Sequence, residues 1–274
     1  MQEYSRGLKR QNKKIGFVPT MGYLHEGHLS LVSRSIKEND ITVASIFVNP
    51  LQFGPKEDFK KYPRAIKADE AMLKKAGVNA LFYPTAAGMY REPYYTYVDV
   101  ERLSEPLCGK SRPGHFKGVA TVVAKLFNLV TPDIAYFGQK DAQQAIIIRK
   151  MAEDLNMGIK IKTVPTVREK SGLAVSSRNA YLNPEEKKDA AILYKSLLLA
   201  KRMIKGGRGS AGEIITKMKA LIKQKRSARI DYVEIVDEKT LKPVRKVHGS
   251  ILIALAVYIG KTRLIDNLRL NVRW

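Results

Sequence analysis

The 274-residue chain lacks the residues and runs on which several protein classes depend. It contains a single cysteine, so a scaffold held together by internal disulfides is excluded. Its longest apolar run, residues 251–259, is too short to cross a bilayer. The first 20 residues carry several basic side chains but no apolar core of a signal peptide. These absences predict a cytoplasmic protein that does not interact with a membrane.

Acidic residues are also scarce. The 26 Asp and Glu against 49 Lys and Arg give a formal net charge of +23. Such an excess attracts anions, whether nucleic acids, acidic membranes or phosphorylated and carboxylated small molecules. The bias is strongest over residues 201–229, where Glu213 is the one acid. This stretch is either a solvated basic surface or a polyanion-binding face. Because no zinc finger, recognition helix or aromatic RNA-binding signature accompanies it, we expect no specific nucleic-acid partner.

Strand-like and helix-like segments alternate along residues 1–180. Continuous apolar strands that alternate with helices are typical of a parallel sheet covered on both faces. We therefore predict a Rossmann-like, doubly wound α/β nucleotide-binding domain, whose ligands lie at the carboxyl ends of the strands. The predicted strands are 15–18, 41–48, 81–83, 97–100, 134–137 and 159–164, and the predicted helices are 28–38, 64–76, 116–130 and 142–155.

A smaller unit is expected over residues 181–274. Asn183 precedes a proline and two glutamates, which is the pattern of a helix start, and predicts a helix as far as Gly206. Ser210 and Glu213 predict a second helix that begins with a capping box. Strands at 230–236 and 251–259 complete a small α+β domain. We expect this domain to close over the active site.

The segment from residue 21 to residue 28 is the clearest candidate for chemistry. It follows a predicted strand and precedes a predicted helix, and it contains two histidines three residues apart. A helix N-terminus attracts phosphate through its free N–H groups and its dipole, and imidazoles can stabilise charge that grows on a phosphoryl group. A zinc pair or a structural turn is the alternative, although His115, His248 and Cys108 show no spacing of further zinc ligands.

Two further segments carry polar groups suited to ATP, and a third lies where a ligand of such a sheet is expected. Gly138 permits close approach, Lys140 supplies a positive charge, and Asp141 can accept from ribose hydroxyls. Ser176, Ser177 and Arg178 lie on a glycine-hinged loop as donors for a triphosphate. Taken alone, this loop is typical of a helix-capping turn. Because it follows the histidine segment in the same chain, a phosphate-binding loop is the favoured interpretation, with residues 174–179 as a lid. The third segment, residues 47–54, follows the second strand.

Together these segments resemble the pantoate–β-alanine ligase family, within the superfamily of His-x-Gly-His nucleotidyltransferases. Residues 112–119, 231–234 and 259–267 share in the resemblance, which covers nearly the whole chain. It implies that (R)-pantoate and β-alanine condense to pantothenate with ATP and Mg²⁺, through a pantoyl adenylate, with release of AMP and pyrophosphate. It also implies a cytoplasmic homodimer. A nucleotidyltransferase of the same superfamily, acting on a phosphorylated acceptor, is the alternative.

The resemblance also implies roles for individual residues. His28 is the catalytic proton donor, His25 lies beside the phosphates, and Lys140 acts on the transferring phosphoryl group. Gln52 and Gln144 bind pantoate, and Gln52 also lies near β-alanine. No residue is implied as a dedicated metal ligand. The residues implied to contact ATP are Met21, Gly22, Tyr23, Leu24, His25, Glu26, Gly27, His28, Gly138, Gln139, Lys140, Asp141, Val167, Val175, Ser176, Ser177 and Arg178.

Four positions depart from the pattern of the family. Tyr23 replaces a small residue, Gln139 an acid, Ala142 an aromatic residue, and Val175 a Met or Leu. None of these changes removes an implied catalytic group. Tyr23 and Val175 belong to the implied ATP pocket, so nucleotide affinity is the property that these departures put in doubt.

Overall fold

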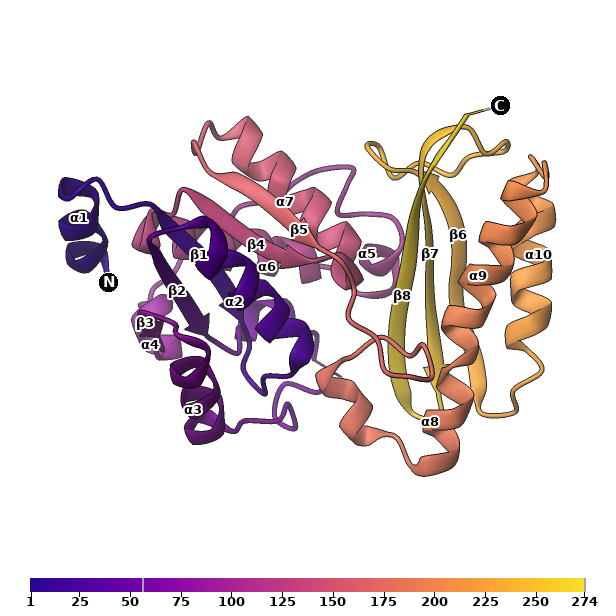
Figure 1. Ribbon diagram of the computed structural model, residues 1–274, viewed down its shortest axis with the longest axis horizontal. Coiled ribbons are helices and arrows are strands. Elements are labelled where there is room, and N and C mark those ends of the chain that lie inside the picture. The colour runs from indigo at the N-terminus through magenta and orange to yellow at the C-terminus, as the bar shows by residue number, and fades with distance from the viewer. Residues whose placement is uncertain (56, 274) are drawn as a thin grey trace. The chain divides into compact units, whose positions relative to one another are not determined.

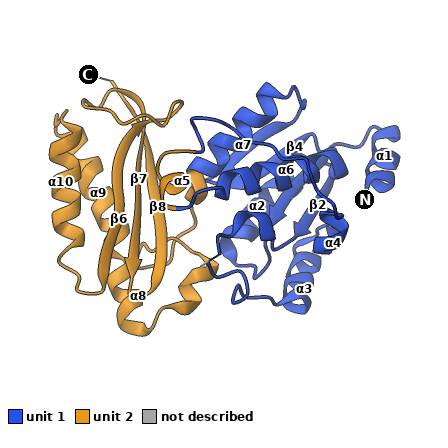
Figure 2. Ribbon diagram, turned by 180° about the vertical axis from the view of Figure 1, so that it is seen from behind, with its two compact units in different colours: residues 1–104, 112–139, 143–165 blue, residues 105–111, 140–142, 166–274 orange. Residues whose placement is uncertain are grey.

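The protein consists of two compact units, described by a computed structural model over residues 1–55 and 57–273 (Figures 1 and 2). The first unit comprises residues 1–104, 112–139 and 143–165, and the second comprises residues 105–111, 140–142 and 166–274. By packing, residues 166–180 therefore go with the C-terminal sheet. The functional boundary after residue 180 and the closure of the smaller domain stay predictions.

The first unit is built on a five-stranded parallel sheet with the strand order β3-β2-β1-β4-β5. This order confirms the predicted doubly wound α/β class. The order reverses between β1 and β4, which is the point where such sheets bind their ligands. The strands are β1 (Ile15–Thr20), β2 (Ile41–Ile46), β3 (Ala80–Phe82), β4 (Ile134–Gly138) and β5 (Lys160–Val164). The helices are α1 (Gln2–Arg10), α2 (Glu26–Glu38), η1 (Pro50–Gln52), α3 (Ile66–Ala76), α4 (Ala86–Met89), α6 (His115–Val130) and α7 (Ala142–Asp154). The short helix η2 (Gln139–Asp141) follows β4, and its residues 140 and 141 are assigned to the second unit.

The two faces of β1 are covered by different helices. A Cβ atom on Gly16 would lie 2.2 Å from the hydroxyl of Ser35, so the glycine lets α2 approach the sheet closely. The next side chain, Phe17, points to the opposite face and meets Phe127 of α6 edge-on, with the ring centroids 6.4 Å apart. Phe17 is completely buried, which contributes about 1.5–3 kcal/mol to folding.

The second unit is a three-stranded antiparallel sheet with helices packed against it. Its helices are α5 (Cys108–Ser111), η3 (Ser177–Tyr181), α8 (Pro184–Ala190), α9 (Ile192–Lys205) and α10 (Ala211–Ile222), and its strands are β6 (Ala228–Asp237), β7 (Gly249–Ile259) and β8 (Thr262–Val272). The apolar stripes of α9 and α10 form one core with alternate residues of β7. Asn183 caps α8 as predicted, because its Oδ1 accepts from the Glu186 N–H at 2.9 Å and the Glu186 carboxylate accepts from the Asn183 N–H at 3.0 Å.

Polar contacts hold α5 to the C-terminal sheet. The Ser111 hydroxyl donates to the Asp231 carboxylate at 2.8 Å, and the same carboxylate forms an ion pair with Arg263 at 2.8 Å. The buried Cys108 thiol lies 3.2 Å from the Tyr232 hydroxyl. These contacts account for the packing of residues 105–111 with the second unit.

Three predicted elements differ in the structure. Residues 97–100 form no strand, because a side chain on α6 satisfies the backbone: the Val98 N–H donates to the Thr121 hydroxyl at 3.0 Å. The single helix predicted from Asn183 to Gly206 is two helices that meet at Ala191. The capping box at Ser210 is half formed: Ser210 accepts from the Glu213 N–H, while the Glu213 carboxylate pairs with Arg208 at 3.1 Å.

A cluster of polar side chains joins the end of α2 to the sheet. The Glu38 carboxylate accepts from the Tyr136 hydroxyl at 2.7 Å and forms ion pairs with Lys162 at 2.8 Å and Arg34 at 2.6 Å. The bond from Lys162 and the bonds from Tyr136 and Arg34 lower the pKa of Glu38 from 4.5 to about 2. Glu38 therefore stabilises the fold in its ionised form.

Replacing Glu38→Gln should lower the free energy of unfolding most at neutral pH. The pKa of Glu38 is depressed in the folded protein, so its contribution is complete above about pH 4.5 and is lost as the pH falls toward 2. Denaturant unfolding of both proteins from pH 7 downward measures this difference. A difference that stays constant as the pH falls below 4.5 would contradict the prediction. Glu70→Gln, at an exposed position, is the control.

Candidate active site

A carboxylate from a distant helix shapes the loop between β1 and α2. Asp69 on α3 is 1% exposed, and its two oxygens accept from the backbone N–H groups of Tyr23 and Leu24, each at 2.8 Å. These bonds hold Tyr23 in the left-handed region with a φ of 51°, directly after Gly22 at 82°. The sequence analysis missed Asp69 because nothing in a helical segment 45 residues downstream indicates a bond to this loop.

The two histidines of the loop stack on each other. Their ring centroids are 4.0 Å apart with an angle of 29° between the planes. The Nδ1 atom of His28 accepts from the His25 backbone N–H at 3.3 Å, so the Nε2 atom carries the proton of the neutral His28 ring. A Cβ atom on Gly27 would lie 2.9 Å from the His25 ring. Glycine is therefore the residue that fits between the histidines.

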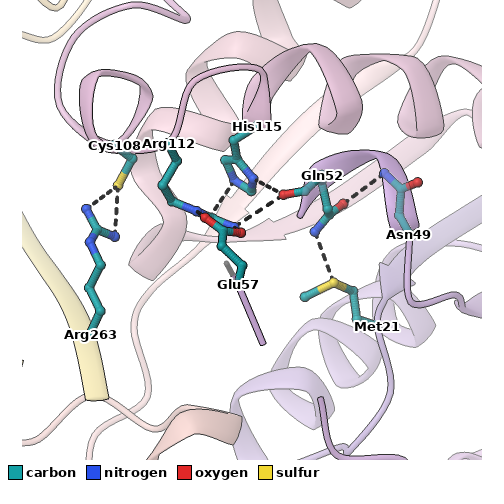
Figure 3. A network of polar contacts seen from close by, with 8 residues as sticks. All are labelled: Met21, Asn49, Gln52, Glu57, Cys108, Arg112, His115 and Arg263. Atoms are coloured by element: carbon teal, nitrogen blue, oxygen red, sulfur yellow. Dashed lines mark hydrogen bonds and ion pairs between the residues drawn. The ribbon is translucent and has the colours of Figure 1, made fainter. Parts of the chain in front are cut away.

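The Gln52 side chain lies next to this loop (Figure 3). Its Nε2 atom points to the Met21 sulfur at 3.0 Å, and its Oε1 atom accepts from the Asn49 amide at 3.1 Å. Asn49 is fixed in turn, because its Oδ1 accepts from the Tyr90 hydroxyl at 2.7 Å and its amide also donates to the Gly118 carbonyl at 3.0 Å. Gln52 is thus a buried amide with a set orientation beside the histidine loop.

The main chain of Gln52 is held from α6 (Figure 3). Its carbonyl accepts from His115 Nδ1 at 2.8 Å and from Arg112 at 3.3 Å. Because Arg112 can only donate to His115 Nε2, 3.0 Å away, His115 is the neutral tautomer protonated at Nδ1. Arg112 also donates to both carboxylate oxygens of Glu57, each at 2.6 Å. Burial acts to raise the pKa of Glu57, but the ion pair with Arg112 lowers it.

The segment after β4 carries the next group of predicted residues. Gly138 ends β4, and Gln139, Lys140 and Asp141 form the short helix η2. The Lys140 ammonium lies 3.5 Å from the Asp141 carboxylate. Gln144, in the first turn of α7, is half-buried.

The predicted phosphate loop lies in the second unit. The Val175 N–H donates to the Val167 carbonyl at 3.0 Å, which closes the stretch between them into a hairpin. Ser176 accepts from the Arg178 N–H at 3.3 Å and begins η3, and Ser177 is buried. The helix-capping turn that the sequence left open as an alternative is therefore present, on the same loop that carries the predicted donors.

The structure thus groups the predicted residues into two sets. Met21 to His28, Gly138, Gln139, Gln52 and Gln144 lie in the first unit, whereas Lys140, Asp141, Val167 and Val175 to Arg178 lie in the second. Among residues 1–55 and 57–273, no three His, Cys, Asp or Glu side chains gather as a metal would require. Within the same residues, no helix has both the length and the hydropathy needed to cross a membrane.

The family model described as pantoate–β-alanine ligase matches residues 1–269. The chain belongs to the pantoate–β-alanine ligase family. Pantothenate synthetase from Caldicellulosiruptor bescii is 54% identical over 268 residues, which are 98% of this chain and 95% of that protein. The pantothenate synthetase structure from Thermus thermophilus is 47% identical, with a TM-score of 0.92 and 96% of both chains covered. The ligase from Francisella tularensis, solved with β-γ ATP and β-alanine, is 34% identical, with a TM-score of 0.77 and coverage of 97% of this chain and 94% of that one.

As a member of this family the chain is an ATP-dependent pantoate–β-alanine ligase. This confirms the activity that the sequence motifs implied, in preference to a nucleotidyltransferase that acts on a phosphorylated acceptor. The match covers nearly the whole of both chains, so it includes the C-terminal sheet as well as the nucleotide-binding fold.

Replacing Asp69→Asn in this ligase should loosen the histidine loop. The new amide keeps one acceptor oxygen but turns N–H donors toward a backbone N–H, so one of the two 2.8 Å bonds is lost. Hydrogen exchange at the amides of residues 22–24 should accelerate, and turnover should fall. Glu70→Gln, on the next residue of α3 but exposed, is the matched control. Unchanged exchange at these amides would show that the carboxylate does not hold the loop.

Proposed function

We propose that this ligase joins its substrates in two steps through a pantoyl adenylate. The observation that carries the proposal is the orientation of His28 at the start of α2. Its Nδ1 accepts a backbone N–H, so the neutral ring carries its proton on Nε2, and a phosphate oxygen at the N-terminus of α2 would accept from that donor. A phosphoryl group that gains negative charge in the transition state is stabilised by such a donor.

In the first step, a pantoate carboxylate oxygen attacks the α-phosphorus of ATP. The new O–P bond forms as the bond to the β-phosphate breaks, and pyrophosphate leaves. His28 donates to the phosphoryl oxygens, with His25 beside it, and Lys140 adds a positive charge. Ser176, Ser177 and Arg178 donate to the triphosphate, and Val167 and Val175 lie against adenine. The rest of residues 21–28 and Gly138 to Asp141 complete the proposed ATP site.

In the second step, the neutral amine of β-alanine attacks the acyl carbon of the adenylate. The C–N bond forms, the C–O bond to AMP breaks, and the amine loses a proton. The amine must be neutral to attack, so this step slows at acidic pH. Residues 174–179 are the proposed lid, since water would otherwise hydrolyse the adenylate.

Gln52 and Gln144 are proposed to bind pantoate, and Gln52 also β-alanine. An amide can donate to a carboxylate and accept from a hydroxyl, and pantoate has both groups. Support for Gln52 comes from its fixed side chain, held by Asn49 at 3.1 Å beside Met21 of the histidine loop.

Magnesium is proposed to arrive with ATP as part of the substrate. Mg²⁺ usually keeps several waters and binds through substrate phosphates and one or two carboxylates. A cytoplasmic homodimer is the proposed state of the protein, on the family resemblance.

The experiment that tests the reaction is AMP release from ATP and Mg²⁺, with pantoate and β-alanine omitted in turn. We expect AMP and pantothenate in equal amounts when both are present. Pyrophosphate exchange into ATP should require pantoate but not β-alanine, because the adenylate forms first. Exchange that requires β-alanine would refute the adenylate order while leaving the ligase activity intact.

Substituting His28→Ala or Lys140→Ala should lower turnover by about 10²–10³-fold, because each removes a group that stabilises charge in the transition state. The rate of pantoate-dependent pyrophosphate exchange measures this loss. Lys37→Ala, at an exposed position on α2, is the control for a lost surface charge. Near-normal exchange in a folded His28→Ala or Lys140→Ala variant would remove that residue from the proposed site.

A further inference from the structure

Strand β8 carries a buried acid, Asp266, that binds the loop formed by residues 167–178 through Arg168. Asp266 is 3% exposed, and its two carboxylate oxygens accept from the two Nη atoms of Arg168 at 2.6 and 2.9 Å. Such a two-point bond fixes the plane of the guanidinium as well as its position. Because Arg168 directly follows Val167 in the chain, the bond fixes the start of this loop on β8.

The other contacts of Arg168 fix the turn of the loop. The guanidinium lies over the Tyr194 ring, with its carbon 3.8 Å from the ring centroid, and it also donates to the Gly172 carbonyl at 3.0 Å. Gly172 has a φ of +89°, and a Cβ atom there would lie 2.6 Å from the Tyr194 ring. The hairpin that leads to Val175 and the phosphate loop is therefore held between Asp266 and Tyr194.

The next residue of β8 holds a different segment. The Asn267 amide donates to the main-chain carbonyl of Lys140 at 2.9 Å, and Asn267 is 5% exposed. The Asn267 backbone N–H also donates to the Asp266 carboxylate at 2.8 Å. Two neighbouring residues on one strand thus bind Lys140 and Arg168, which are 28 positions apart in the sequence.

We propose that Asp266 and Asn267 are positioning residues of the adenylation step. Asn267 sets the main chain of Lys140, and Asp266, through Arg168, sets the loop that carries Ser176, Ser177 and Arg178. The proposal rests on the phosphate-binding role proposed for these residues above. A strand is a rigid base for both segments, so the ammonium and the loop donors keep a fixed spacing, and orientation of this kind is a large part of catalysis.

The test is a double-mutant cycle with Lys140. Asn267→Ala in the full-length protein should lower pantoate-dependent pyrophosphate exchange roughly 10–100-fold, the scale of a displaced catalytic group. The KM for pantoate should stay the same, because the binding of pantoate is proposed for Gln52 and Gln144 and not for Lys140. In a Lys140→Ala background, Asn267→Ala should cause no further loss, since the group it positions is absent.

Asn271→Ala is the matched control, on the same strand at an exposed position, and should leave exchange unchanged. If Asn267→Ala does not fold, Asn267→Asp replaces it, because it keeps the shape and removes the N–H donor. For Arg168, the variant Arg168→Lys keeps the charge but not the two-point bond. It should raise the KM for ATP and lower the exchange rate, while the thermal midpoint changes little.

The outcomes separate this inference from the proposed function. Equal losses from Asn267→Ala with and without Lys140, or full exchange activity in a folded Asn267→Ala variant, would overturn the positioning role alone. Normal exchange in Lys140→Ala would overturn both the role of Lys140 and its positioning by Asn267. Loss of the effect of Asn267→Ala in the Lys140→Ala background would support the inference.

Discussion

The parallel pairing of β1 with β2 on one side and β4 on the other is the constraint on which the candidate site depends. Every N–H and C=O along a central strand needs a partner, and this pairing supplies them. The register places Thr20 opposite Ile46, so the histidine loop and the segment that contains Gln52 leave the sheet at the same edge. The sheet therefore decides which chain segments meet before any side chain makes a specific bond.

Buried polar side chains then set the conformation of each segment. Asp69 satisfies two N–H groups of the histidine loop, Asn49 orients the Gln52 amide, and His115 receives the Arg112 N–H while donating to the Gln52 carbonyl. Each of these groups costs free energy to bury and regains it only in one geometry. That requirement makes the loops around the site as well defined as the strands.

Acidic residues are few in this chain, and several are committed to such tasks. Asp69, Glu57 and Asp266 are buried or half-buried, and their carboxylates hold loops or arginines rather than facing solvent. The chain has 49 Lys and Arg against 26 Asp and Glu. The basic residues lie largely at exposed positions, many of them between residues 201 and 229. A positive surface of this kind raises the local concentration of the anionic substrates ATP and pantoate.

The sequence by itself determined the doubly wound class, the helix start at Asn183 and the family, because these depend on local periodicity, capping and contiguous motifs. The helix expected from His28 begins two residues earlier, at Glu26, with His25 as its N-cap. The assignment of residues 97–100 to a loop was decided only by the tertiary structure, since Thr121 on α6 takes the bond that a strand partner would have made. The partners Asp69, Asn49, Arg168, Asp266 and Asn267 were decided there too. A hydrogen bond between residues 45 or 98 positions apart leaves no local signal, because it forms only when packing brings both groups out of water together.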